Sequence, residues 1–241
     1  MAMPTTIPPK WLPLGLPLEN GDRMRQPEFH RRYEQCPEGV KFELVGGIVY
    51  MASPLILTHS NYDEELSFPY GVYRRATEGV AVIHGASTFL GEESEPQPDL
   101  GLFILPEYGG QTTTTVVKKK LYIKGPPELL TEIAVSARAL DMHLKQHDYR
   151  KAGVREYVVL CVEEEELHWF DFHQGGMIEP DVKGVFRSRV FPGLWIDGPA
   201  LLARDSAQVE KLLRQGLKSQ EHAAFVLQLK KARTERKQRR A

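Results

Sequence analysis

Two short apolar stretches, each carrying one acidic residue, decide the fold of this chain. The first is Pro98-Asp99-Leu100-Gly101-Leu102-Phe103-Ile104, and the second is Leu129-Leu130-Thr131-Glu132-Ile133-Ala134-Val135. Both have the length and apolar content of buried β-strands. An ionised carboxylate is costly to bury in such a strand unless a partner or a metal ion compensates its charge. The two stretches therefore predict strands that hold a compensating group beside Asp99 and Glu132.

Strands and helices alternate on both sides of these stretches, as is typical of an α/β fold. The run from Lys41 to Met51 indicates two strands or one bent strand, with Gly46-Gly47 as its turn. Residues 106–125, rich in Gly, Thr and Lys, are expected to form a loop. The other expected elements are helices at 23–34 and 60–77 and strands at 80–90, 97–105, 127–135, 156–162, 167–172 and 184–190.

A well-marked helix separates the second acidic strand from the strand at 156–162. Asp141 is suited to cap its N-terminus, and Gly153 is suited to end it. Strand, helix and strand at this spacing predict a crossover onto one sheet. Further on, Pro192-Gly193-Leu194 is expected to end the β region.

The alternation of side chains gives each acid a small neighbour. Residues two apart on a strand share a face, so Asp99 shares its face with Gly101, and Glu132 shares its face with Ala134. These small side chains are expected to leave the room that a metal ion and a phosphate would need.

One stripe of the helix directs Lys145 toward the sheet. Met142, Lys145, Tyr149 and Ala152 fall at i, i+3, i+7 and i+10, which is one face of an α-helix. Either the lysine stem packs while its ammonium reaches water, or the ammonium joins the two acids. The acids themselves fit a metal site or buried ion pairs about equally well. Two acids with a lysine nearby indicate a divalent-metal site for phosphodiester hydrolysis.

The overall charge excludes few functions, but its distribution is uneven. Of 241 residues, 41% are hydrophobic and 26% are charged, and the net charge of -1 argues against a protein coated in positive charge for nucleic acid. Basic residues gather at 118–120 with Lys124, and at 230–240, where seven basic residues accompany one acid. The segment after Asp205 is expected to be helical, with a fresh cap at Ser219.

The cysteines and the N-terminal segment indicate a cytoplasmic protein. Cys36 and Cys161 are the only cysteines, and without a Cys-x-x-Cys pair a thiolate zinc site is disfavoured. Cys161 lies in an apolar run and is expected to be a buried free thiol. Residues 1–22 are Pro-rich and lack the apolar core of a signal peptide, and no apolar run is long enough to span a bilayer.

Four short motifs occur in order along the chain: Gln97-Pro98-Asp99-Leu100, Glu132-Ile133-Ala134, Asp141-Met142-His143-Leu144-Lys145 and Lys151-Ala152-Gly153-Val154-Arg155-Glu156-Tyr157. With them, the region from Phe42 to Trp195 resembles the putative restriction-endonuclease family that is abundant in cyanobacteria. That family belongs to the PD-(D/E)XK nuclease superfamily. The resemblance covers roughly two thirds of the chain, and the motifs are specific as an ordered set.

The resemblance implies an α/β domain with a restriction-endonuclease-like mixed sheet flanked by helices and a C-terminal helical appendage. We expect a Pro-rich arm at 1–22, the endonuclease-like domain at 23–204 and a basic, helical extension at 205–241.

The resemblance also implies the site residues. Asp99 and Glu132 match the motif acids and are expected to hold Mg²⁺ or Mn²⁺. The superfamily lysine normally stands two residues after the second acid, where this chain has Ala134, and Lys145 is the implied substitute. Glu43 matches a further acid of the family and is a third, weaker catalytic candidate.

Several histidines and aromatic residues carry weaker signals. His59 matches a recurrent histidine of the family. His143 and His147 have a metal-ligand spacing but fall on the opposite side of the helix from Lys145, so a solvated face is expected. Three aromatic side chains that could stack bases are expected to pack in the core instead: Trp169, Phe170 and Phe172.

The function that follows is a metal-dependent nuclease that hydrolyses phosphodiester bonds, with DNA as the favoured substrate. Its expected partner is nucleic acid, no membrane is involved, and a homodimer is left open. The alternative is a non-catalytic nucleic-acid-binding or regulatory protein that keeps the nuclease fold, which Ala134 favours. A structural or assembly role of the C-terminal helices is a further alternative.

Overall fold

The structure is a computed structural model and describes residues 17–52, 56–135 and 138–239. Its helical elements are α1 (Gln26–Tyr33), α2 (Leu57–Ala76), the 3-10 turn η2 (Pro106–Tyr108), the π-helical turn η3 (Leu140–Lys145), α3 (Gln146–Ala152), α4 (Gly198–Leu202), α5 (Ser206–Gly216) and α6 (Gln220–Gln238). Its strands are β1 (Phe42–Val45), β2 (Ile48–Met51), β3 (Val80–His84), β4 (Thr88–Phe89), β5 (Leu100–Ile104), β6 (Thr113–Val117), β7 (Lys120–Lys124), β8 (Leu129–Ala134), β9 (Glu156–Cys161), β10 (Glu166–Asp171), β11 (Val185–Arg187) and β12 (Trp195–Asp197).

A mixed five-stranded sheet, with strand order β10-β9-β8-β5-β3, forms the centre of the fold. β8 and β9 are parallel and are joined through η3 and α3, which confirms the predicted crossover. The other neighbouring strands of this sheet are antiparallel. β5, β8 and β9 are buried along their whole length, as expected for apolar strands covered on both faces.

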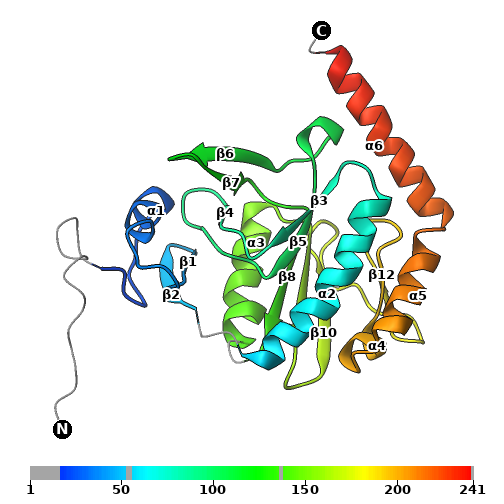
Figure 1. The fold of residues 1–241 in the computed structure, drawn as a ribbon, viewed down its shortest axis with the longest axis horizontal. Coiled ribbons are helices and arrows are strands. Elements are labelled where there is room, and N and C mark those ends of the chain that lie inside the picture. Colours follow the sequence, from blue (N-terminus) through cyan, green and yellow to red (C-terminus); the bar gives the residue numbers. More distant parts are fainter. Residues whose placement is uncertain (1–16, 53–55, 136–137, 240–241) are drawn as a thin grey trace.

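Helices cover the two faces of this sheet (Figure 1). On one face, Leu66 and Tyr70 of α2 pack in a cluster with Leu100 and Leu129. On the other face, Tyr149 of α3 belongs to a second apolar cluster. Burying a large apolar side chain stabilises a fold by about 1.5–3 kcal/mol, so the two clusters fix both helices against the strands.

Asp99 and Glu132 both line a pocket at one end of the sheet. Ala134, two residues after Glu132, belongs to the cluster around α3, and Glu132 contacts Tyr149 of that helix, so the face predicted for Glu132 and Ala134 is confirmed. The room expected beside Gly101 is absent. A Cβ atom there would lie 2.8 Å from the carbonyl oxygen of Leu129, so Gly101 permits the close approach of β5 and β8.

The segment 106–125 was expected to be a loop, and this expectation is wrong. An antiparallel hairpin runs from Thr113 to Lys124, formed by β6 and β7. β7 also pairs with β4, giving a three-stranded sheet of order β4-β7-β6. The single strand expected at 80–90 is therefore divided between two sheets, with β3 in the central sheet and β4 in the smaller one.

The β region continues beyond the break expected at Pro192-Gly193-Leu194. β12 follows that segment and pairs with β11, and α4 begins directly afterwards. The sequence prediction missed both elements, since each is only a few residues long.

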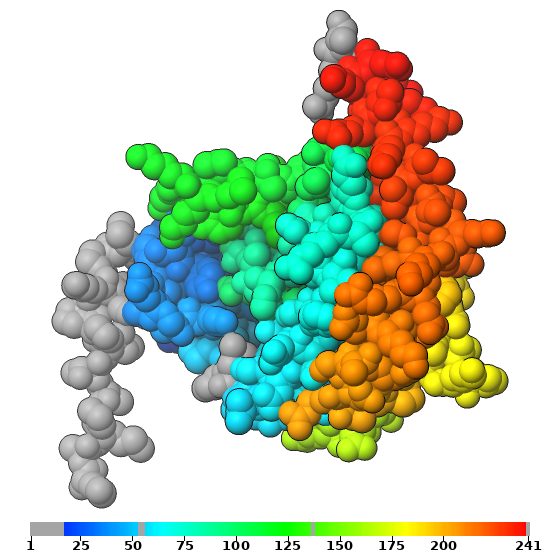
Figure 2. Space-filling model, turned by 45° about the vertical axis from the view of Figure 1, so that its right-hand side comes forward, coloured from blue at the N-terminus to red at the C-terminus, as the bar shows by residue number. Residues whose placement is uncertain are grey.

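α5 packs beside α2, and α6 packs against η2 (Figure 2). Asp205 and Ser219 cap α5 and α6 through their side chains, as predicted. Leu213, Phe225 and Leu229 are buried in the same cluster as the α2 face of the sheet. The domain boundaries remain predictions, and the expected arm lies mostly in residues outside the described ranges. In the part of the chain described, no helix is long and apolar enough to cross a membrane.

Candidate active site

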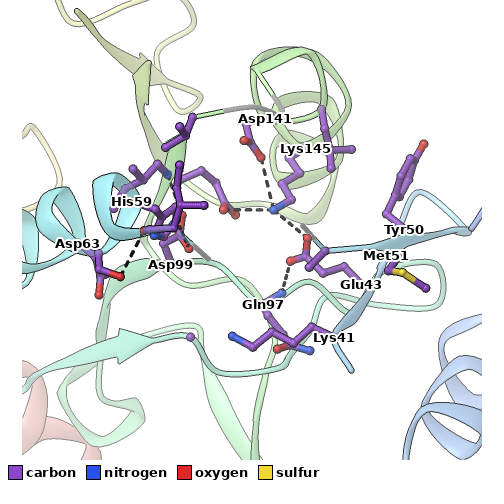
Figure 3. Close-up of a pocket in the computed structure, with 18 of the residues that line it drawn as sticks. Lys41, Glu43, Tyr50, Met51, His59, Asp63, Gln97, Asp99, Asp141 and Lys145 are labelled. Carbon is purple, nitrogen blue, oxygen red and sulfur yellow. Dashed lines mark hydrogen bonds and ion pairs between the residues drawn. The ribbon is translucent and has the colours of Figure 1, made fainter. Parts of the chain in front are cut away.

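A pocket of about 280 Å³ lies at one end of the central sheet, beside the start of α2. We call it the acidic pocket. Five of its ionisable side chains, from four parts of the chain, lie close together: Glu43 of β1, Asp99 before β5, Glu132 of β8, and Asp141 and Lys145 of η3. Figure 3 shows Glu43, Asp141 and Lys145 converging, with Asp99 beside His59. The structure thus brings together all four catalytic residues predicted from the sequence.

The ammonium of Lys145 lies among three carboxylates. Its Nζ is 3.0 Å from Glu43, 3.1 Å from Glu132 and 3.4 Å from Asp141. The residue is only 4% exposed, so the interpretation with the ammonium in water is excluded. Burial alone would lower the pKa of Lys145, but the charges of Glu132, Glu43 and Asp141 outweigh it and raise that pKa well above its ordinary value. Lys145 therefore stays charged.

Glu132 is almost fully buried and uses both carboxylate oxygens. Oε2 faces Lys145, and Oε1 accepts a hydrogen bond of 2.6 Å from the hydroxyl of Tyr149. Burial, with the nearby charges of Asp99 and Asp141, raises the pKa of Glu132 well above its ordinary value, against the opposite effect of Lys145. Burial likewise raises the pKa of Tyr149, so its hydroxyl stays a donor.

Asp99 is held beside Glu132 by the backbone of β8. Its Oδ2 accepts a hydrogen bond of 2.8 Å from the amide of Ile133, the residue directly after Glu132. Its Oδ1 lies 3.2 Å from Nε2 of His59, on α2. That hydrogen bond raises the pKa of His59 against the effect of burial. Lys145 was expected to contact both motif acids, but it contacts Glu132, while Asp99 pairs with His59.

Asp141 does not cap the helix as expected, because it lies inside the π-helical turn and points into the pocket. Burial, with the charges of Glu43 and Asp99, raises the pKa of Asp141 to about 6. Sequence analysis missed its place in the site, although Asp141 and Lys145 have the i, i+4 spacing of an ion pair. π-Helical turns occur frequently at functional sites.

The donor chemistry of the pocket fits a hard divalent cation. Five carboxylates line the pocket with two lysines and two histidines, so negative charge is in excess when the acids and lysines are ionised. Mg²⁺ is commonly bound by one or two carboxylates, with water and substrate phosphate as further ligands. Asp99 and Glu132 fit this pattern. Each of their four carboxylate oxygens contacts one protein group and has a second lone pair that can bind a metal ion. Among the described residues, no group of three or more His, Cys, Asp or Glu side chains is placed to hold a metal ion.

The other candidates lie where the sequence predicted. His143 and His147 are exposed on the outer side of the helix. Trp169 and Phe170 are buried, and Cys161 is a buried free thiol. These residues take no part in the acidic pocket.

Comparisons with known proteins agree with this architecture. A solved structure of a putative nuclease belonging to DUF820, from Anabaena variabilis ATCC 29413, is 14% identical, covers 72% of this chain and 96% of its own, and has a TM-score of 0.54. At that identity the likeness shows the fold alone, and it confirms the expected nuclease-like fold. No curated protein matches the chain. The model of the Uma2 family, described as "Putative restriction endonuclease", matches residues 27–201. Since that match contains the central sheet, its crossover and the whole acidic pocket, the chain belongs to the Uma2 family of putative restriction endonucleases.

Proposed function

We propose that this protein is a metal-dependent nuclease that hydrolyses phosphodiester bonds in DNA. One observation carries the proposal: a buried, charged lysine touches Glu132, while the amide of the next residue holds Asp99. Two carboxylates and a fixed ammonium at the edge of a pocket form the constellation that phosphodiester hydrolysis needs. Membership of the family supports the same class of reaction.

Each side chain has a role that follows from its contacts. Asp99 and Glu132 would hold Mg²⁺ or Mn²⁺, since hard cations prefer carboxylate oxygens. The chemistry supplied by such a bound ion is polarisation of the phosphoryl group and a lower pKa of the attacking water. Lys145 orients that water or stabilises the charge that develops on the phosphate. Glu43 and Asp141 position the Lys145 ammonium from two further sides.

The rival is a nucleic-acid-binding or regulatory protein that keeps the fold without turnover. The observation favouring it is that three carboxylates surround the Lys145 ammonium. An ammonium has three N–H donors, so none is left to bind the substrate. In that case the ion pairs of Lys145 would be purely structural, and Ala134 would mark the loss of the usual catalytic lysine.

Turnover decides between the two. The purified full chain is incubated with labelled double-stranded DNA, single-stranded DNA and RNA, with Mg²⁺, with Mn²⁺ or with chelator. Cleavage of DNA that needs metal and disappears in a Glu132→Gln preparation supports the proposal. Binding of nucleic acid without cleavage under every condition supports the rival. Sedimentation of the same preparation tests the homodimer, which remains a prediction.

A further inference from the structure

The hairpin of β6 and β7 projects from the body of the molecule, and the proposed function assigns it no role (Figures 1 and 2). Its two-residue turn consists of Lys118 and Lys119, with φ angles of 46° and 70°. A tight hairpin turn with both central φ angles positive strongly favours Asn-Gly. Lysine at both positions strains the backbone, and such strain persists where a function uses the residues.

The end of the hairpin combines positive charge with exposed apolar surface. Three lysines are exposed there, Lys118, Lys119 and Lys120, and Lys124 is exposed at the base of the hairpin, opposite Thr113. Lys118 pairs with Glu34 at 2.8 Å, yet its side chain is still 69% exposed. Directly behind the turn, Val116 and Leu121 lie opposite each other on the two strands and are 66% and 69% exposed. A polyanion with apolar groups would complement this surface.

The hairpin lines a pocket whose wall continues, along the chain, into the wall of the acidic pocket. Lys120 and Tyr122 of β7 line a second pocket together with Val40 and Ser87. Lys41, the residue after Val40, lines the acidic pocket. A ligand bound along the hairpin would thus extend toward the candidate active site.

We propose that the β6–β7 hairpin is a docking arm for duplex DNA, an inference that rests on the proposed nuclease function. The major groove of B-DNA admits a two-stranded β-ribbon, whereas that of duplex RNA is too narrow for side chains to read. The lysines of the turn contact backbone phosphates, and Val116 and Leu121 contact apolar edges such as thymine methyl groups. The arm holds the duplex while the acidic pocket acts on a phosphodiester nearby.

The decisive variant improves the turn while it removes charge. In Lys118→Asn with Lys119→Gly the turn takes its preferred residues, so the melting temperature should rise by a few degrees. Affinity for a short labelled DNA duplex, measured with chelator present, should fall on the order of tenfold or more. The slope of log affinity against log salt should decrease by about 0.9 for each lost phosphate contact. If the turn is purely structural, the melting temperature should rise while the duplex affinity and the salt slope stay unchanged.

A matched control removes two exposed lysines from a different part of the surface. Lys211→Gln with Lys218→Gln, at and after α5, loses the same charge and should bind the duplex like the unaltered chain. An equal loss of affinity in this control would show that only net charge matters, and would overturn the proposal.

Other partners are separated by a second variant, Val116→Thr with Leu121→Thr. Sedimentation measures whether this variant loses self-association, and vesicles of phosphatidylserine and phosphatidylcholine measure whether it loses membrane binding. If either is lost while the turn variant still binds duplex normally, the arm serves another partner and the proposal fails. Because chelator prevents cleavage, the result is independent of turnover. A chain that binds duplex through the arm but never cleaves it contradicts only the proposed nuclease.

Discussion

Glu132 and Glu156 are buried on neighbouring strands of one sheet, yet their surroundings differ in kind. Glu156 is 0% exposed and accepts four hydrogen bonds, from the side chains of Trp169 and Ser188 and from the amides of Arg189 and Val190. Glu132 has one hydroxyl donor, a shared ammonium and three further carboxylates nearby.

This is the difference we expect between a structural carboxylate and the carboxylate that we propose binds metal. Burial raises the pKa of both acids, so that shift does not distinguish them. Neutral donors from β10 and from the segment after β11 fix Glu156 in place and leave it closed to solvent. The like charges around Glu132 cost stability and lie at the wall of a pocket. Acids with strongly perturbed pKa values beside a cleft mark a candidate functional site.

The strongest test of the contrast between Glu132 and Glu156 is to remove the two proposed metal ligands. Asp99→Asn and Glu132→Gln should each abolish strong Mn²⁺ binding in calorimetry while the protein stays folded. Loss of metal-assisted catalysis worth several kcal/mol lowers turnover on the order of 10³-fold. Glu163→Gln, an exposed acid, is the matched control and should behave like the unaltered protein. Unchanged Mn²⁺ affinity in both variants would refute a shared site.

The next variant removes the ammonium. Lys145→Met should keep Mn²⁺ binding and lose about 10²–10³ in turnover, the usual cost of one positioned electrostatic donor. Lys151→Met, on the adjoining helix α3 with a side chain 62% exposed, is the control and should cleave normally.

Removing a buried cation also destabilises a protein, so Lys145→Met needs a partner variant. Lys145→Met combined with Asp141→Asn relieves one of the carboxylates left behind and should recover part of the lost stability. Full cleavage by this folded double variant would show that Lys145 is a structural residue only.

Glu156→Gln should have the opposite profile, with stability lost and turnover kept. Glutamine would direct an NH₂ group at donors that now serve a carboxylate oxygen, including the indole N–H of Trp169. Leaving buried donors unpaired costs about 1–3 kcal/mol, which chemical denaturation measures directly. A stable Glu156→Gln protein with impaired cleavage would place Glu156 among the functional acids instead.

The smallest expected effect is a gain. Burial raises the pKa of Asp141 from its ordinary value of 3.8 to about 6, so the folded protein binds the proton more tightly than the unfolded chain does. This contribution is complete at low pH and is lost as the pH rises through about 6. Asp141→Asn lacks that loss and should be about 1–2 kcal/mol more stable than the unaltered protein at pH above 7.

Urea unfolding of both proteins across this pH range tests the effect. The advantage of Asp141→Asn should shrink as the pH falls below 6. Parallel curves at all pH values would mean that Asp141 is not held in a field of like charges.

Regular features of the sequence predicted most of the central sheet and the direction of Lys145. Apolar runs marked β5, β8 and β9, and the 3.6-residue period placed Met142, Lys145 and Tyr149 on one side of the helix. Both signals depend on burial, which dominates the folding energy.

The sequence did not indicate features that depend on contacts between distant parts of the chain. The hairpin at 113–124 lacks the Gly or Asn expected in a tight turn and carries lysines instead, so it resembled a loop. Asp141 was assigned to a cap because caps and pocket acids use the same residue type, and only the three-dimensional partners separate them. The role of His59 beside Asp99 likewise depends on how α2 meets the sheet.

The burial of the C-terminal helices has a consequence for biosynthesis. Leu213, Phe225 and Leu229 complete the apolar cluster on the α2 side of the central sheet, although they are translated after every strand of that sheet. Domains fold as units as they leave the ribosome. Until these helices emerge, the nascent chain exposes the apolar surface they will cover, so chaperone protection is needed between the synthesis of β10 and that of α6.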